Sequence, residues 1–452
     1  MNAITSAANK PVLTPQIEAP SVPVSIEDTG IPTAVLENLL LKHLAHEAKA
    51  DLLRLSELLG LSTHLVEELM LALRKRSLIE VYQKQHTALQ SHQTTSKNHV
   101  LYGLSASGLQ QAEIAFLKDA YIGPAPVSLE DYRSVVTRQD IRRNNINKDH
   151  LESALKGIYG SEYMVPILGP ALNSGRALLL YGHAGTGKSF VAAQLLNAFE
   201  TSVYIPYSVF TSGNIVKVYS DLHHTKVDNA STAQTIHFNQ GYDQRWALCE
   251  RPNIQVGGEL TLNMLEVNHS EHNRVWLAPL QMLANNGLLI IDDLGRQSMS
   301  VDALLNRWIV PMEYSIDHLV LPSGQQATIP FVLTLAFSTN LNPLDIADPA
   351  FLRRLGYKIE FFPLNQSDYL ALTESVCRSS KVKSSPSVLR FLLSLHESQG
   401  VPFYPCVPKD IIGICEDIIS FEEIDSVITN NVMEAAWRLY FTSDGVGGQK
   451  YE

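Results

Sequence analysis

The stretch YGHAGTGKSF at 181–190 combines glycines with a lysine and a hydroxyl residue, directly behind an apolar run. Its spacing, Gly182-x-x-x-x-Gly187-Lys188-Ser189, fits a phosphate-binding loop (P-loop), in which glycines let backbone N–H groups wrap phosphate oxygens at a helix N-terminus. In such a loop the lysine contacts the β and γ phosphates and the hydroxyl binds Mg²⁺. The predicted nucleotide-binding residues of the loop are Gly182, His183, Ala184, Gly185, Thr186, Gly187, Lys188, Ser189 and Phe190.

Two adjacent carboxylates could bind the metal and activate water, which a phosphate-binding loop alone cannot do. In GLLIIDDLGRQ at 287–297, four aliphatic residues precede Asp292 and Asp293, which is the form of a buried strand that ends in acids. We predict that Asp292 holds Mg²⁺ through water, together with Ser189, and that Asp293 orients and activates the attacking water. The predicted chemistry is the binding of ATP with Mg²⁺ and the hydrolysis of ATP.

A sheet with covering helices is needed to bring these residues together. Ala177–Tyr181 is predicted to be a buried strand and Ser189–Phe199 a helix, which is the context that a phosphate-binding loop requires. A third strand, in PFVLTLAFSTNLNP at 330–343, ends near Asn340. A short helix in DPAFLRRLGYKIEF at 348–361 precedes a further strand. The pattern indicates an α/β domain.

On these motifs the chain resembles the AAA+ ATPases over about 151–440. The resemblance implies a P-loop parallel sheet with a helical lid, and a hexamer-like ring. Asn340 matches the sensor 1 residue that positions the attacking water, and Lys409 stands where many relatives have a sensor 2 arginine. Arg353 and Arg354 match the region of the arginine finger, which reaches the γ-phosphate held by a neighbouring subunit. For either arginine, the alternative is a surface ion pair.

Two features depart from the simplest members of that family. Most AAA+ motors have Asp-Glu where this chain has Asp292-Asp293, and the shorter carboxylate favours slow hydrolysis. From Lys188 to Asp292 the chain runs 104 residues, so we expect an insertion around 213–276. The insertion resembles those with which helix-2-insert AAA+ proteins touch a partner. The alternative is an ordinary hairpin that covers the core.

The N-terminal part is predicted to be a separate domain. Three helical patterns followed by two strand patterns resemble a winged helix. The same order, with the stretches GPALNSGRALLLYG, IDDLGRQ, LLNRWIVPMEY and FLRRLGYKI, resembles a set of bacterial predicted ATPases described as chaperone-like. The expected organisation is a disordered tail (1–28), a winged-helix domain (29–120), a linker (121–145), the AAA+ α/β domain (146–363) and the helical lid (364–452).

Charge and composition restrict the partners. The net charge of −11 argues against a protein that coats nucleic acid, and between 31 and 120 nine Lys/Arg balance nine Asp/Glu. We therefore favour a protein partner, with DNA contact through Lys84, Lys97 and Arg74–Arg76 as the alternative. The four cysteines show no zinc spacing and suggest reduced thiols in the cytoplasm. No signal peptide and no long apolar run occurs, so no membrane contact is expected.

The hypothesis that follows is a ring-forming AAA+ ATPase that remodels a protein partner in a chaperone-like way. The alternative from another class is a nucleic-acid-associated loader or transcriptional regulator whose winged helix docks on DNA. The Asp-Asp ending also leaves open a nucleotide-bound scaffold that hardly turns over.

Overall fold

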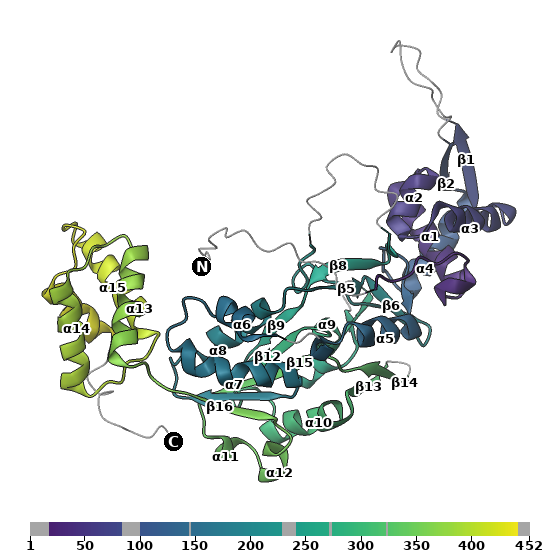
Figure 1. Cartoon of the computed structure of the whole chain (residues 1–452). Helices are drawn as coiled ribbons and strands as arrows, with labels where there is room; N and C mark the ends of the chain where they lie inside the picture. The colour runs from purple at the N-terminus through teal and green to yellow at the C-terminus, as the bar shows by residue number, and fades with distance from the viewer. Residues whose placement is uncertain are drawn as a thin grey trace.

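The chain forms three regions in a row: N-terminal helices, a central α/β body and a C-terminal helical domain (Figure 1). Among the described residues, none of the helices has the length and apolar character needed to cross a membrane. The computed structural model describes residues 18–83, 100–143, 146–227, 241–270, 274–321 and 324–441.

The N-terminal region contains three helices followed by an antiparallel hairpin, which is the predicted order. A fourth helix, α4 (Ala106–Lys118), was not predicted and packs along the first. Lys84 and Lys97, the cations suggested for DNA contact, lie outside the described residues. The winged-helix interpretation of this order stays a prediction. The elements are η1 (Glu27–Thr29), α1 (Thr33–Glu47), α2 (Leu52–Leu59), α3 (Thr63–Lys75), and the antiparallel strands β1 (Ile79–Gln83) and β2 (Val100–Leu104).

The predicted disordered tail requires a correction for residues 18–28, whereas 1–17 lie outside the described residues. The Asp28 carboxylate accepts hydrogen bonds from the backbone of Val24 and Ser25, and Ile26 is buried in the N-terminal core. The Pro20 carbonyl accepts a bond from the backbone N–H of Asp243. A local turn and one buried apolar side chain therefore order a stretch whose composition lacks any helical or strand period.

The predicted linker over 121–145 also requires a correction. It contains β3 (Val127–Ser128), α5 (Leu129–Arg138) and η2 (Ile141–Arg143), while 144–145 are not described. Tyr132 and Val135 of α5 are buried in a hydrophobic core. Prolines and glycine break the chain at 121–126, but the apolar residues behind them repeat at helical spacing and dock α5 on its neighbours.

The central sheet is parallel throughout, as predicted, with strand order β16-β4-β15-β12-β9. Alternate residues of each strand face opposite layers: Leu178 and Leu180 pack with one core, and Leu179 with the other. Both faces are therefore covered, as parallel sheets require. The strands are β4 (Leu178–Gly182), β9 (Asn253–Val256), β12 (Leu288–Ile291), β15 (Thr334–Thr339) and β16 (Tyr357–Phe361).

Helices cover both faces of this sheet. One face is packed by residues from α6 (Lys148–Ala154), α7 (Ser161–Ser174), α8 (Lys188–Gln194) and η3 (Leu195–Ala198). Trp308 is fully buried against the other face. That face is covered by α9 (Leu280–Leu283), α10 (Val301–Tyr314), α11 (Pro343–Ile346), α12 (Pro349–Leu352) and η4 (Leu262–Leu265).

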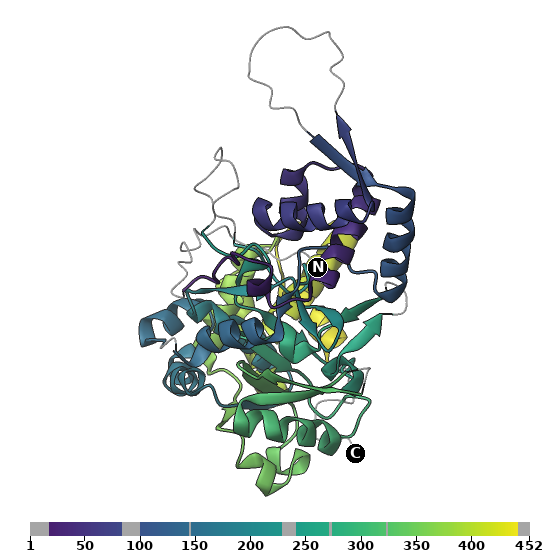
Figure 2. The same ribbon diagram turned by 90° about the vertical axis from the view of Figure 1, so that its right-hand side faces the viewer.

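A second β layer lies between the central sheet and the N-terminal helices. One sheet has the order β10-β11-β7-β6-β3, and two antiparallel pairs, β5–β8 and β13–β14, pack on the same core. Phe210 and Ile215 of this layer also reach the N-terminal core, and Figure 2 shows the helices stacked above it. Its further strands are β5 (Ser202–Pro206), β6 (Ser208–Thr211), β7 (Asn214–Lys217), β8 (Trp246–Glu250), β10 (Asn268–Ser270), β11 (Val275–Leu277), β13 (Ile316–Val320) and β14 (Gln326–Pro330).

The predicted insertion around 213–276 must be redrawn. β9 falls within that range, yet it pairs with β12 as the edge strand of the central sheet. The additional chain therefore enters in two parts, one between η3 and β9 and one between β9 and β12. β9 has only four residues with alternating burial, which is too short a pattern to separate it from the strands around it.

The C-terminal region is helical, as predicted. Its four helices enclose a core of their own around Tyr369, His396 and Trp437. Residues 442–452 lie outside the described part of the chain. The helices are α13 (Gln366–Ser379), α14 (Pro386–Gln399), α15 (Val407–Phe421) and α16 (Asn430–Tyr440).

Candidate nucleotide-binding site

The carboxyl edge of the central sheet collects the polar residues that the sequence analysis selected. Because all strands of this sheet are parallel, the segments after β4, β9, β12 and β15 leave it at the same edge. These segments carry, in the same order, the glycine-rich loop, Gly257, the carboxylates Asp292 and Asp293, and Asn340. Open parallel sheets bind ligands at this edge.

The loop 182–188 has the backbone that only glycine adopts easily. Gly182, Gly185 and Gly187 have φ of 133°, 80° and 87°. Gly187 precedes α8 as its N-cap, so the loop opens directly into the helix. The Thr186 hydroxyl donates to the His183 carbonyl at 2.8 Å and closes the loop on itself.

Lys188 lies at the centre of the site with its side chain buried. Its Nζ donates to the carbonyls of Gly182 (2.9 Å) and His183 (2.8 Å) and to Oδ1 of Asn340 (2.8 Å). Burial lowers the pKa of Lys188, while the charges of Asp292 and Asp293 act in the opposite direction. The ammonium is therefore held inside the loop by neutral acceptors, and two carboxylates stand nearby.

Ser189 and Asp292 face each other across the edge. The Ser189 hydroxyl donates to Oδ1 of Asp292 at 2.8 Å, and Oδ2 of Asp292 accepts from the Gln255 side chain of β9 at 2.8 Å. A hydroxyl and a carboxylate in contact form a set of hard oxygen donors, which suits Mg²⁺ with phosphate and water as the remaining ligands. Both predicted metal-binding residues, Ser189 and Asp292, therefore fit the ion. The sequence motif did not indicate the hydrogen bond from Gln255 to Asp292.

Asp293 and Asn340 form the second polar pair. Nδ2 of Asn340 donates to Oδ1 of Asp293 at 3.2 Å, so Asn340 joins Asp293 to Lys188. Asp293 has φ of 48°, a left-handed conformation that residues other than glycine seldom adopt. The predicted water-activating acid and the predicted sensor thus meet at one point beside the loop.

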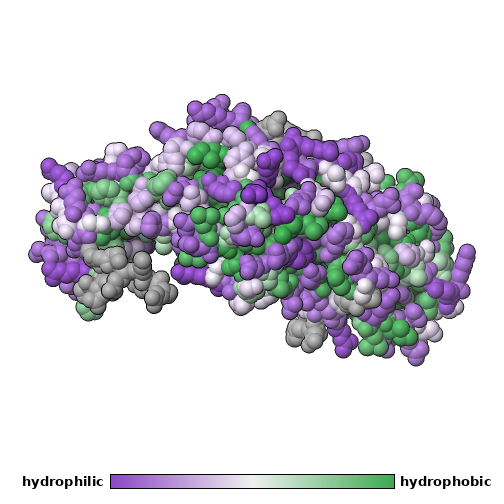
Figure 3. All heavy atoms as spheres, turned by 90° about the horizontal axis from the view of Figure 1, so that it is seen from below, coloured by the Kyte–Doolittle hydropathy of each residue, from purple (hydrophilic) through white to green (hydrophobic). Residues whose placement is uncertain are grey.

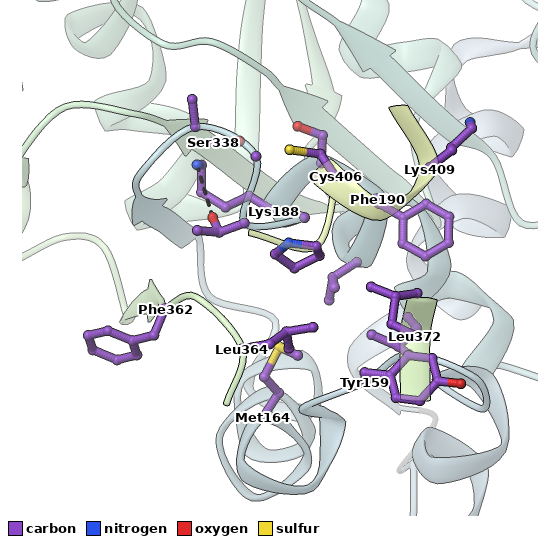
Figure 4. Close-up of a pocket in the computed structure, with 18 of the residues that line it drawn as sticks. Tyr159, Met164, Lys188, Phe190, Ser338, Phe362, Leu364, Leu372, Cys406 and Lys409 are labelled. Atoms are coloured by element: carbon purple, nitrogen blue, oxygen red, sulfur yellow. Dashed lines mark hydrogen bonds between the residues drawn. The ribbon is translucent and has the colours of Figure 1, made fainter. Parts of the chain in front are cut away.

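A cavity of about 600 Å³ opens from the loop toward the C-terminal domain. In Figure 4, Tyr159 and Leu372 lie together at the end remote from Ser338, and Met164 lies beside Leu364. Among the described residues that line the cavity, Lys409 and Asp410 are the charged ones besides Lys188, Asp292 and Asp293. Such a lining suits a flat, apolar heterocycle next to the phosphate loop.

Sequence reasoning missed this apolar end. Its residues come from the segment before the P-loop (Ile158, Tyr159, Met164) and from α13 (Leu372, Val376). They share no motif with the loop. They reach the cavity because the segment before α7 meets α13, where the Tyr159 hydroxyl donates to the Ala371 carbonyl at 3.0 Å.

The C-terminal domain touches the loop directly. The backbone N–H of Cys406 donates to the Gly185 carbonyl at 3.3 Å, and a Cβ on Gly185 would lie 2.5 Å from the Cys406 sulfur. Lys409, on the first turn of α15, also lines the cavity, but in Figure 4 its amine points away from Lys188. The structure thus places the predicted sensor 2 residue at the rim rather than at the phosphate end.

The two arginines lie elsewhere. Arg353 and Arg354 precede β16, which runs parallel to β4, so they stand at the amino edge of the sheet, opposite the P-loop. Arg354 pairs with Glu313 of α10 at 2.5 Å, and Arg353 is exposed. Within the described parts of the chain, no arginine lines the cavity. The ion-pair alternative therefore applies to Arg354 in the isolated chain.

Comparisons with known proteins give partial matches. Residues 365–439, most of the C-terminal helices, match a family described as a domain of unknown function, DUF8689. A search of curated proteins found no match.

Two solved structures show what the chain is similar to in three dimensions. NtrX from Brucella abortus, in complex with ADP, is 12% identical with a TM-score of 0.40, covering 62% of this chain and 55% of its own. RuvB from Thermotoga maritima, a Holliday junction branch migration motor, is 13% identical with a TM-score of 0.38, covering 64% and 73%. The chain thus spans little more than half the length of NtrX.

Proposed function

We propose that this chain is an AAA+ ATPase that binds Mg²⁺ and ATP at the carboxyl edge of the central sheet and hydrolyses the nucleotide slowly. One observation carries the proposal: two sets of polar bonds, Ser189–Asp292 and Lys188–Asn340–Asp293, join the P-loop to the ends of β12 and β15. The strand order, with the P-loop strand between β16 and β15, supports the same family.

Each residue would then have a defined task. Lys188 would leave its carbonyl acceptors and contact phosphate oxygens, because a buried ammonium gains more from a charged acceptor than from neutral ones. Ser189 and Asp292 would hold Mg²⁺, which neutralises phosphate charge when bound. Asp293 would accept a proton from water, and Asn340 would orient that water. The apolar end of the cavity would accept the adenine ring.

Binding and turnover can be tested separately. A fluorescent ATP analogue should bind the full chain more tightly with Mg²⁺ than with a chelator, and unlabelled ATP should displace it. GTP, whose base carries additional polar groups, should compete less well, since Met164, Leu372 and Val376 make that end of the cavity apolar. Equal binding of an unrelated anion such as citrate at the same concentration would count against a nucleotide site.

We further propose that the active species is a ring in which a neighbouring chain supplies an arginine. In one chain Arg353 and Arg354 stand at the edge opposite their own P-loop, so a completed site needs a second copy. Arg353, being exposed, is the better candidate for the finger. The face in Figure 3 presents hydrophobic side chains among hydrophilic ones. Tyr314 of α10 and Leu344 of α11 are exposed, which supports contact with another copy.

Mixing two inactive variants tests action in trans. A Lys188→Ala chain keeps its arginines, and an Arg353→Ala/Arg354→Ala chain keeps its P-loop. Combined, they should recover part of the ATPase activity, because some interfaces pair an intact loop with an intact arginine. Mixed oligomers without recovered activity would contradict a finger supplied in trans, and a monomer with concentration-independent turnover would contradict the ring.

For the partner we propose a protein rather than DNA. The outward face of α3 presents His64, Glu67, Glu68 and Leu71, so acids stand where a DNA-reading helix needs cations. The four cysteines are free, which supports a reducing, cytoplasmic location. ATPase stimulation by DNA, together with salt-sensitive DNA binding, would instead support a DNA-loading or regulatory role.

A further inference from the structure

The side chain of Gln297 binds the turn that carries Asp293 at several points. Its Nε2 donates to the backbone carbonyls of Asp292 (2.9 Å), Asp293 (3.3 Å) and Gly257 (3.3 Å), and its Oε1 accepts from the N–H of Gly295 (3.0 Å). One amide thus serves four backbone groups on two segments.

The backbone held in this way is the strained part of the site. Asp293 has φ of 48°, and Gln297 binds the two carbonyls that flank the Cα of Asp293. The opposite side of the turn is bound to β15, through Leu294 N–H to the Ser338 carbonyl (2.8 Å). Gln297 therefore completes a clamp between β15 and the loop that follows β9.

The Asp293 carboxylate itself has little to hold it. Its bond to Asn340, at 3.2 Å, is long for a charged acceptor. Where the carboxylate points is consequently set by the backbone of the turn rather than by side-chain partners. Gln297 does not line the cavity, so it has no direct contact with the space that a nucleotide would fill.

We propose that Gln297 is a positioning residue: it holds the Asp292–Gly295 turn in the left-handed conformation that aims Asp293 at the attacking water. The inference rests on the proposed ATPase function and deepens it. Loss of Gln297 should leave nucleotide binding intact and slow the chemical step, because Ser189 and Gln255 still hold the Asp292 carboxylate while Asp293 is displaced. A misplacement of about 1 Å can cost on the order of 100-fold in rate.

Two substitutions separate the donor from the bulk of the side chain. Gln297→Met keeps the length and loses every hydrogen bond, whereas Gln297→Glu keeps an acceptor for Gly295 and loses the donor to three carbonyls. Both should lower kcat roughly 10- to 100-fold and leave the Kd for ATP within about threefold. Ser298→Ala, on the adjacent exposed residue, is the matched control and should match the wild type.

A double-mutant cycle distinguishes positioning from general loosening of the fold. If Gln297 acts through Asp293, then Asp293→Asn/Gln297→Met should be no slower than Asp293→Asn alone. Rate losses that multiply in the double variant would overturn the inference. Thermal melting of each variant shows whether it is folded, and Gln297→Glu decides the question should Gln297→Met not fold.

Different results would contradict the positioning role of Gln297 and the proposed ATPase function. Wild-type chain that binds ATP and releases phosphate, with Gln297→Met and Gln297→Glu at wild-type kcat, overturns the positioning role alone. Wild-type chain that neither binds nor hydrolyses ATP overturns the ATPase proposal and the positioning role with it. A rise in the Kd for ATP with unchanged kcat also contradicts the positioning role.

Discussion

The carboxyl edge of the central sheet and the second β layer are both assembled from segments far apart in the chain, but they are held together differently. At the edge, directed hydrogen bonds join Lys188 to Asn340 and Ser189 to Asp292. In the second layer, strands of two to five residues meet through apolar side chains such as Val127, Val209 and Leu319. Directed bonds need particular residues, whereas apolar packing needs volume and shape.

That difference gives the two regions opposite responses to substitution. A change at the edge should stop binding or chemistry in a chain that stays folded. A change in the second layer should lower the free energy of unfolding and leave the nucleotide affinity of the folded chain as it was.

The largest effect is expected for Lys188→Ala. The variant should bind ATP at least about 100-fold more weakly, since a buried phosphate site loses its charged hydrogen-bond donor. Titration calorimetry measures the affinity. Lys217→Ala, at an exposed position of β7 in the second layer, is the matched control and should bind like the wild type. Equal affinities for the two variants would remove the P-loop assignment.

Asp293→Asn should separate turnover from binding. The variant should bind ATP with nearly wild-type affinity and release phosphate roughly 100-fold more slowly, because the amide cannot accept the proton of the attacking water. Asp302→Asn, an exposed position at the start of α10, should keep the wild-type rate. A wild-type rate for Asp293→Asn would show that another group activates the water.

The motif residues could be placed from the sequence because their spacing reflects a loop and strand ends that lie next to one another in any such sheet. The apolar end of the cavity could not, since Tyr159 and Leu372 meet only through the packing of the C-terminal domain. The second layer escaped prediction for a related reason. Its strands are too short for periodicity, and the pairing of β11 with β7 joins residues about sixty positions apart.

Asp317→Ala tests the second β layer. Asp317 of β13 is buried and forms a bidentate pair with Arg307 at 2.6 and 2.9 Å. Removing one partner of a buried pair should lower the free energy of unfolding by about 3 kcal/mol, measured by denaturant titration. Glu266→Ala removes the more exposed partner of the same arginine and should cost less than about 1 kcal/mol. A loss of ATP affinity in folded Asp317→Ala would break the separation between the regions.

The smallest effect concerns pH and the C-terminal core. His396 is buried, and because the Val401 carbonyl can only accept, Nδ1 donates to it and Nε2 accepts from the Tyr369 hydroxyl. Burial lowers the pKa of His396 below its ordinary value of 6.5. The unfolded chain therefore takes up a proton that the folded chain excludes, so stability is full above about pH 6.5 and falls as pH drops toward the folded pKa.

The slope identifies the group. Unfolding measured across pH 5 to 8 should lose at most about 1.4 kcal/mol per pH unit from this histidine below pH 6.5. His396→Gln should remove that part of the slope, and His64→Gln, at an exposed position of α3, should retain it. A slope unchanged by His396→Gln would assign the pH dependence to other buried histidines, such as His43 and His224, whose pKa values burial also lowers.

Phosphate release by the purified chain decides whether the polar edge of the sheet is an ATP-hydrolysing site. With ATP and Mg²⁺, release should saturate with ATP, stop when the metal is chelated and fall by roughly 100-fold in Asp293→Asn. Release that is absent in the wild type at saturating ATP, or that persists unchanged in both Lys188→Ala and Asp293→Asn, would contradict ATP hydrolysis at this edge.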